Sequence, residues 1–298
     1  MISVHSVGVI GTGAMGGGVV RSLVRAGVET FARDIRPEAE AAAVRDGASA
    51  CATPAELARA CDAIILLVVD AEQIDTVLFG IDGAVAALAR GAIVLVSSTV
   101  DPAYPWGLVP RLAEHGIALL DAPVSGGPAK ATAGTMTMMV SGDGTALARM
   151  QPVLQRITGR LFALGPRAGD ASTFKIVNNL LAATNLAAAA EAMALAVRAG
   201  LDPRQVFDVI NASSGASWIF GDRMPRVLDG DYAPRAAAKI LTKDVGIAAA
   251  LAERLGVDGT FARTALAAFS DALAAGYGED DDAVVVKRAM EKGNVPKA

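Results

Sequence analysis

Two polar side chains that can do chemistry, Lys175 and Asn179, lie four residues apart in a long apolar stretch. The stretch from Gly165 to Ala199 is mostly Ala, Leu, Val, Met and Asn, which predicts a helix buried on most of its circumference. On such a helix the two side chains share one face, so the amine can exchange a proton while the amide orients a ligand. The alternative is that Lys175 lies in an exposed first turn and extends its amine into water.

Either Ser172 or Thr173 can cap the start of this helix, because both hydroxyls are suited to accept an N-terminal N–H. An Ala residue, Ala171, stands immediately before them. The other elements that position Lys175 are expected earlier in the chain.

A glycine-rich turn stands near the start of the chain. The β-branched run Val4–Ile10 predicts a strand, and Gly11, Thr12, Gly13, Ala14, Met15 and Gly16 follow it before an apolar helix pattern. In this context the backbone can approach a pyrophosphate at the N-terminus of the helix. The alternative is a tight strand-to-helix turn with no ligand.

An acidic residue, Asp34, follows the second predicted strand, Val28–Ala32, and lies eighteen residues beyond Gly16. An acid at this point can accept hydrogen bonds from the adenosine ribose and would repel a 2′-phosphate. Arg33 and Arg36 flank it and could pair with that phosphate, but the next residue is Ile35, so the pattern favours NAD over NADP. A plain loop acid is the alternative.

Apolar strands then alternate with helices, which predicts a parallel sheet covered on both faces. The expected elements are a helix over 54–60, a strand over 63–69, a helix from residue 71 and a strand over 92–96. Ligands gather at the carboxyl ends of such strands, so Asp70 and Thr99 are candidates to lie near the nicotinamide. Thr99 could equally cap a turn before Pro102.

A second glycine-containing loop follows the predicted strand Ile117–Leu120. Ser125, Gly126 and Gly127 offer a hydroxyl and exposed backbone N–H groups that could hold a carboxylate. The alternation over 135–141 then predicts a strand, antiparallel to its neighbours, with Met136 and Met138 on one face in the core.

Beyond a last strand over 160–164 the sequence predicts only helices. Their expected positions are a start at Leu201–Pro203, then Trp218–Leu228, Lys239–Leu255, Thr260–Ala275 and Asp282–Met290. The predicted fold class is therefore α/β, with a Rossmann-type doubly wound sheet over 1–164 and an all-helical domain over 165–298, joined by a long interdomain helix. The first domain is expected to bind the cofactor and the second to serve substrate binding and oligomerisation.

Composition limits the partners. The 298 residues carry 27 basic and 31 acidic side chains, a net charge of −4, with no basic run, so no nucleic acid or anionic membrane is expected and the ligand should be small. Cys51 and Cys61 stand without a nearby His, which indicates neither a metal site nor a disulfide framework. The N-terminus lacks a signal-peptide pattern and the apolar stretch over 180–197 contains Asn185 and Glu191, so a cytoplasmic protein without a membrane span is predicted.

Four motifs occur in the order seen in the β-hydroxyacid dehydrogenases, the family of 3-hydroxyisobutyrate dehydrogenase and tartronate semialdehyde reductase. They are the turn at 11–16, the Asp-Ala-Pro-Val-Ser-Gly-Gly loop at 121–127, Lys175 with Asn179, and Lys243 with Asp244. Over nearly the whole chain the sequence resembles this family. Five further stretches are most similar to members that oxidise the C2 hydroxyl of a four-carbon sugar acid: 78–80, 191–196, 217–220, 229–232 and 276–281.

The resemblance implies a role for each motif. The turn glycines, Asp34 and Thr99 would contact NAD, the Ser125 loop would bind the substrate carboxylate, and Lys243 would close over nicotinamide and substrate. Lys175 would be the catalytic residue and Asn179 would support the reacting hydroxyl. Family members are dimers or tetramers, so a homodimer or homotetramer is expected. Ala171 replaces the glycine usual in the family just before the catalytic helix.

The expected chemistry is oxidation of a hydroxyl group, with NAD as the hydride acceptor. His5 and His115 lie near no motif, so lysine is left to take the hydroxyl proton. An amine can do so when burial and a positive nicotinamide lower its pKa. Tartronate semialdehyde and 3-hydroxyisobutyrate remain alternative substrates, and an NAD-binding sensor without turnover is the non-enzymatic alternative.

Overall fold

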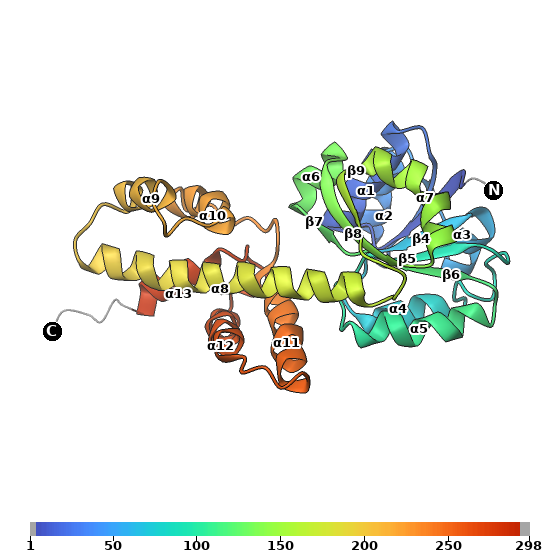
Figure 1. Ribbon diagram of the computed structural model, residues 1–298. Coiled ribbons are helices and arrows are strands. Elements are labelled where there is room, and N and C mark those ends of the chain that lie inside the picture. Colours follow the sequence, from blue (N-terminus) through green and yellow to red (C-terminus); the bar gives the residue numbers. More distant parts are fainter. Residues whose placement is uncertain (1–3, 293–298) are drawn as a thin grey trace. The chain divides into compact units, whose positions relative to one another are not determined.

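The computed structural model describes residues 4–292, and the chain divides into two compact units, residues 1–175 and 176–298. Strands are confined to the first unit, and the described part of the second consists of helices and loops (Figure 1). The α/β class with a Rossmann-type sheet and an all-helical C-terminal region is confirmed.

The first unit is built on one nine-stranded sheet, in the order β3-β2-β1-β4-β5-β6-β8-β7, with β9 paired to β8. Its first six strands run parallel, because helical crossovers connect them. They are β1 (Ser6–Ile10), β2 (Glu29–Arg33), β3 (Ser49–Ala50), β4 (Ala63–Leu66), β5 (Ile93–Val96) and β6 (Ala118–Asp121). The carboxyl ends of these strands therefore meet along one edge.

The remaining three strands extend the sheet beyond β6. These are β7 (Val124–Ser125), β8 (Met136–Gly142) and β9 (Thr158–Ala163). As predicted, β8 runs antiparallel to β6 and β7, and Met136 and Met138 are buried in one core. It also pairs with β9 in parallel, a contact the alternation did not predict.

Two apolar cores cover the two faces of the sheet, since successive strand residues point to opposite faces. Ala63 and Ile65 of β4 face the core formed with helices α1 and α7, and Ile64 and Leu66 face the other. The helices of this unit are α1 (Ala14–Arg25), α2 (Pro37–Arg45), α3 (Pro54–Ala60), α4 (Ala71–Phe79), α5 (Ala103–Ala113), α6 (Gly127–Ala133) and α7 (Gly144–Ile157).

The second unit packs its helices around a core that contains Leu186, Met193 and Phe269. The helices are α8 (Asp170–Arg198), whose first turns belong to the first unit, then α9 (Pro203–Asn211), α10 (Trp218–Leu228), α11 (Ala238–Arg254), α12 (Thr260–Ala274) and α13 (Val284–Lys292). The expected positions of α10, α11 and α12 are correct to within one residue at each end.

The long helix α8 departs from the sequence prediction in two ways. It is not buried on most of its circumference, because Val177, Leu181 and Leu195 are 58%, 62% and 70% exposed. It begins at Asp170, so Ser172 lies inside its first turn and does not cap it; the Thr173 hydroxyl donates to the Gly169 carbonyl. Among the described helices, α8 alone is long and apolar enough to cross a membrane, a test that core helices also pass.

Candidate active site

The turn over 11–16 closes tightly between β1 and α1. A Cβ atom at Gly16 would lie 1.9 Å from the Gly11 carbonyl oxygen, and one at Gly11 would lie 2.6 Å from the Leu67 oxygen. Gly11 also adopts a φ of 88°, which favours glycine. Gly13 is the N-cap of α1 and has no side chain, so no capping side chain occupies the first N–H groups of this helix. This is the geometry that suits a pyrophosphate.

The carboxylate of Asp34 is fixed beside this turn. It is 6% exposed and accepts hydrogen bonds from Thr12 N (2.7 Å), Arg36 N (2.9 Å) and Arg36 Nε (3.3 Å). Burial alone would raise the pKa of Asp34, but the hydrogen bonds from Arg36 and Thr12 and the Arg36 charge together lower it. Asp34 is therefore a stable anion that links the end of β2 to the glycine turn.

The flanking arginines are both held by acids. The Arg33 guanidinium pairs with Glu40 at 2.8 Å, and Arg36 pairs with Asp34 itself. A Cβ atom at Gly13 would lie 2.9 Å from Arg36 Nη2, so this guanidinium lies directly over the turn. Ile35 is 84% exposed and carries no charge toward a 2′-phosphate.

The candidates on the next strands lie where the parallel sheet predicts them. Asp70 caps α4, its carboxylate accepting from Gln73 N at 2.9 Å, and Thr99 is half-buried three residues beyond β5. Both follow carboxyl ends of parallel strands, with Asp34. Their contact with nicotinamide stays a prediction.

The loop at Ser125 has the backbone that an anion site requires. Gly126 and Gly127 adopt φ values of 124° and 75°, and the stem of Lys130 packs against Gly126, whose Cβ would lie 2.8 Å from Lys130 Cδ. Lys130 is a cation that sequence reasoning missed. Its spacing of five residues after Ser125, one turn into α6, was the available signal.

Lys175 lies in the first turns of α8 and is 9% exposed, so it is not the exposed lysine of the alternative interpretation. The start of this helix is bound to Asp121, the last residue of β6, through hydrogen bonds from Gly169 N and Ser172 N. Ala171, where the resemblance leads one to expect a glycine, is buried and helical. The glycine that the backbone requires is Gly169, with a φ of 100° and a Cβ position 2.4 Å from the Pro102 oxygen.

The second unit brings Asn179 and Lys243 together through a residue that the sequence analysis treated only as part of a motif. Asp244 is 3% exposed, accepts from Asn179 Nδ2 at 2.7 Å and pairs with Lys243 Nζ at 2.9 Å. Asn179 is 8% exposed and lies one turn beyond Lys175 on α8. Asp244 thus fixes which way the Asn179 amide points, and the Asn179 carbonyl oxygen accepts from Asn178 Nδ2 at 3.1 Å.

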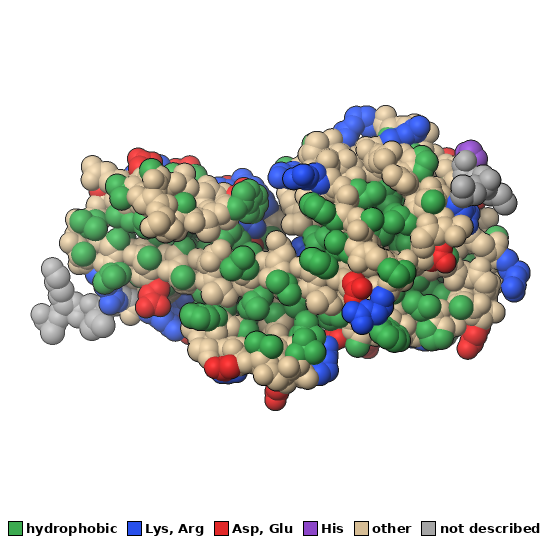
Figure 2. Space-filling model, in the orientation of Figure 1, with side chains coloured by type: hydrophobic (Ala, Val, Ile, Leu, Met, Phe, Trp, Pro, Cys, Tyr) green, Lys and Arg blue, Asp and Glu red, His purple; other side chains and the backbone are tan. Residues whose placement is uncertain are grey.

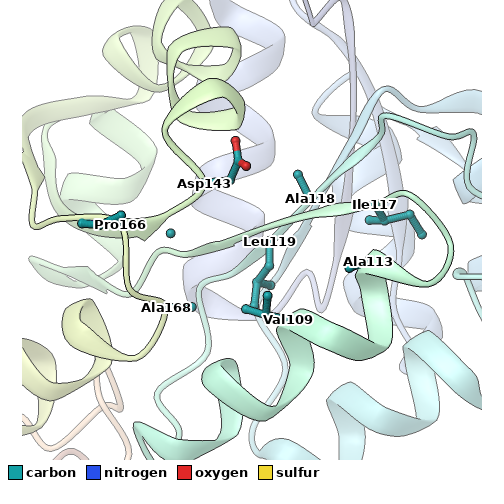
Figure 3. Close-up of a pocket in the computed structure, with 9 residues that line it drawn as sticks. Val109, Ala113, Ile117, Ala118, Leu119, Asp143, Pro166 and Ala168 are labelled. Carbon is teal, nitrogen blue, oxygen red and sulfur yellow. The ribbon is translucent and has the colours of Figure 1, made fainter.

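A separate cavity of about 240 Å³ lies at the opposite end of the sheet strands (Figure 3). Its walls come from α5, from the amino end of β6 and from the loop before α7. Most of the lining residues are apolar, such as Val109 and Leu119, and Asp143 is the acidic one. The Asp143 carboxylate already caps α7 by accepting from Ala146 N. The cavity is therefore not the predicted cofactor site.

Among residues 4–292 no group of three His, Cys, Asp or Glu side chains could hold a metal ion. Cys51 and Cys61 are buried and unpaired, and burial raises the pKa of the Cys61 thiol to about 12. These thiols are accordingly poor nucleophiles.

Comparison with known proteins agrees with this geometry. Residues 6–165 match the NAD binding domain of 6-phosphogluconate dehydrogenase, and residues 169–289 match the NAD-binding domain of NADP-dependent 3-hydroxyisobutyrate dehydrogenase. A solved structure of 3-hydroxyisobutyrate dehydrogenase from Salmonella typhimurium superposes with a TM-score of 0.88 at 43% identity, covering 95% of this chain and 99% of the other.

Two curated relatives are similar over nearly their full length. L-threonate dehydrogenase from Cupriavidus necator is 46% identical over 95% of both chains, and that from Escherichia coli K12 is 43% identical over 94% of this chain and 93% of the other. The fold and the two matched NAD-binding domains define a nicotinamide-dependent dehydrogenase. Within that class, the chain belongs to the 3-hydroxyisobutyrate dehydrogenase-like family of NAD-dependent hydroxyacid dehydrogenases.

Proposed function

We propose that the protein oxidises L-threonate to 2-oxo-tetronate with NAD. The observation that carries this proposal is the similarity to L-threonate dehydrogenases from five sources, which are 41–46% identical over at least 94% of this chain. A serine dehydrogenase and a 3-hydroxyisobutyrate dehydrogenase from Pseudomonas aeruginosa are 33% and 32% identical. The similarity therefore favours a four-carbon sugar acid.

In this proposal residues 1–164 form the NAD-binding domain and residues 165–298 the substrate and oligomerisation domain. NAD would lie against the turn over 11–16, with its ribose at Asp34 and its nicotinamide near Asp70 and Thr99, and would supply the hydride acceptor. The bare N-terminus of α1 and the stable Asp34 anion support this placement. Lys243 would close over the nicotinamide.

The substrate carboxylate would bind at Ser125, Gly126 and Gly127; the positive φ values of the two glycines support this proposal, because such a backbone can expose N–H groups to an anion. Lys175 would take the proton of the C2 hydroxyl as hydride leaves its carbon, and would return it in the reverse direction. The protonated amine then stabilises negative charge on the reacting oxygen. Asn179, oriented by Asp244, would hold that hydroxyl.

The test is a pair of substitutions at Lys175. Lys175→Ala should lower kcat by roughly 10² to 10⁴, the usual contribution of positioned proton transfer, with NAD affinity nearly unchanged. Lys175→Arg should fail equally, because a guanidinium keeps its proton near neutral pH. Near-normal turnover of Lys175→Arg between pH 7 and 9 would show that Lys175 only binds the anion.

The second candidate is a 3-hydroxyisobutyrate or tartronate semialdehyde type of activity, which the solved Salmonella relative favours by its name. A panel of C3 to C6 hydroxyacids with NAD separates the candidates, the expected result being the highest kcat/KM for L-threonate. No absorbance change with any of them would favour an NAD-binding sensor.

We also propose a cytoplasmic homodimer or homotetramer. The helical unit leaves large apolar side chains in water, among them Leu181, Leu195, Val209 and Trp218, and apolar side chains are spread over its surface in Figure 2. Sedimentation as a monomer at micromolar concentration would contradict the oligomer.

A further inference from the structure

A buried carboxylate holds the start of α8. Asp121 ends β6, is 0% exposed, and accepts hydrogen bonds from four neutral donors, all within the first unit. The donors are Gly169 N (2.9 Å), Ser172 N (2.8 Å), Ser172 Oγ (2.6 Å) and Ser141 Oγ (3.3 Å). Such a carboxylate is expensive to bury, which indicates that its place is required.

Two of the four donors are backbone N–H groups at the start of α8, which a helix cannot satisfy by itself. Gly169 N and Ser172 N bind Asp121 directly, and Ala171 N donates to Ser141 Oγ at 3.0 Å, which in turn donates to Asp121. A negative charge at this end is also attracted by the positive end of the helix dipole. The first turn of α8 is thereby fixed to the sheet in both position and rotation.

Lys175 follows Ser172 by three residues, so the two lie on adjacent turns of one face, with a rise of roughly 4.5 Å between their backbones. Any rotation or slip of the first turn moves the Lys175 amine by a comparable distance. Misplacement of a reacting group by about 1 Å can cost on the order of 10² in rate.

We propose that Asp121 is a positioning residue, which acts through Ser172 to place the Lys175 amine relative to the carboxyl edge of the sheet. The proposal rests on the catalytic role proposed for Lys175. Neither Asp121 nor Ser172 touches the reacting atoms; they fix the register of the helix that carries the amine.

The experiment removes one hydrogen bond at a time. Ser172→Ala deletes the 2.6 Å contact to Asp121, and Ser172→Thr keeps the hydroxyl. Thr173→Val is the matched control, because it deletes a neighbouring hydroxyl that donates to the Gly169 carbonyl and not to Asp121. We expect Ser172→Ala to lower kcat roughly tenfold, with the dissociation constant of NADH unchanged. Ser172→Thr should recover most of the loss and Thr173→Val should lower kcat far less.

A second background separates positioning from a general loss of structure. Adding Ser172→Ala to Lys175→Ala should leave kcat where Lys175→Ala alone puts it, because the positioned amine is gone. The same tenfold loss in both backgrounds would overturn the positioning role and leave the Lys175 assignment standing. If Lys175→Ala keeps wild-type kcat, the catalytic assignment itself is overturned. Should Ser172→Ala fail to fold, Ser141→Ala replaces it, with a smaller loss of kcat expected and the same background comparison deciding.

Discussion

The two units bury carboxylates by different means. In the sheet unit Asp121 is held by backbone N–H groups and serine hydroxyls. In the helical unit Asp281 and Asp282 are 0% and 2% exposed and face guanidinium groups, with Arg223 bound to Asp282 at 2.6 Å and Arg226 to Asp281 at 3.1 Å. The difference follows from what each architecture has to offer.

Carboxyl ends of parallel strands lie next to helix N-termini, where N–H groups lack acceptors, so a strand-end acid finds neutral donors. The flanks of a helix have no such donors, since their N–H groups are already bonded. An acid packed among helices must instead use loop N–H groups and side-chain cations. Asp281 uses both, accepting from Arg235 N at 2.9 Å as well as pairing with Arg226.

The comparison predicts its largest effect in the helical unit. Arg223→Leu leaves buried Asp282 without its cation and should destabilise folding by about 3–5 kcal/mol. Thermal unfolding of the variant measures the loss. Arg204→Leu is the control, because Arg204 and its partner Asp229 are more than 60% exposed, and equal losses for the two variants would contradict the argument.

An intermediate effect is expected for Asp121→Asn. The amide keeps the shape of the side chain but replaces one of its two accepting oxygens with an NH₂ group, which cannot accept a hydrogen bond, so the loss should be about 1.5–3 kcal/mol. Urea unfolding gives the value. A loss as large as that of Arg223→Leu would mean that neutral donors hold a carboxylate as firmly as a cation does.

The two buried carboxylates, Asp281 and Asp121, should change the stability of the protein in opposite directions as the pH changes. Burial would raise the pKa of Asp281, but the Arg235 N–H and the charges of Arg226 and Arg223 lower it. Its contribution to stability is therefore present above about pH 4 and is lost as the pH falls through the lowered value. Burial outweighs the hydrogen bonds at Asp121 and raises its pKa, so stability falls as the pH rises from about 4 through the raised value.

Unfolding measured from pH 3 to 7 tests both signs. Asp281→Asn should lose less stability on acidification than the wild type, and Asp121→Asn should rise more steeply above about pH 4. If the stability of the two variants changed with pH in the same way, the predicted difference between Asp281 and Asp121 would be wrong.

The smallest effect is expected at the surface, where the units should not differ. Arg21 pairs with Asp46 at 2.7 Å in the sheet unit and is 45% exposed. Arg21→Leu should cost roughly a tenth of the Arg223→Leu effect, because water screens exposed pairs. Thermal unfolding of the two variants side by side gives the ratio.

Sequence alone predicted the features that depend on local pattern. Asp34 lies directly after β2 because the strand–turn–helix–strand unit has a fixed length, and β8 alternates because one of its faces is buried. The β4 strand was predicted to extend to residue 69, but it ends at Leu66. There the chain turns over Gly11, whose Cβ position lies 2.6 Å from the Leu67 oxygen, so tertiary contact overrides the apolar run.

Features that depend on distant partners were not predictable. The Asp121 contacts to Gly169 and Ser172 join residues 48 and 51 positions apart, and no periodicity encodes them. Hydropathy likewise could not show that α8 leaves Leu181 and Leu195 exposed. The hydropathy of a leucine is the same whether its side chain packs inside the protein or lies on the surface. The roles of the candidate site residues stay predictions.

The anchoring of α8 also sets an order of events during folding. Asp121 ends β6, and strands β1 to β6 all lie within the first 121 residues. Three of the four donors to Asp121, however, belong to residues 169–172. Until that segment arrives, the carboxylate is solvated by water, and the closure of a loop of this length must precede its burial. Docking of α8 is therefore a late step in the assembly of the sheet unit, and a ribosome must release the chain beyond residue 172 before it can occur.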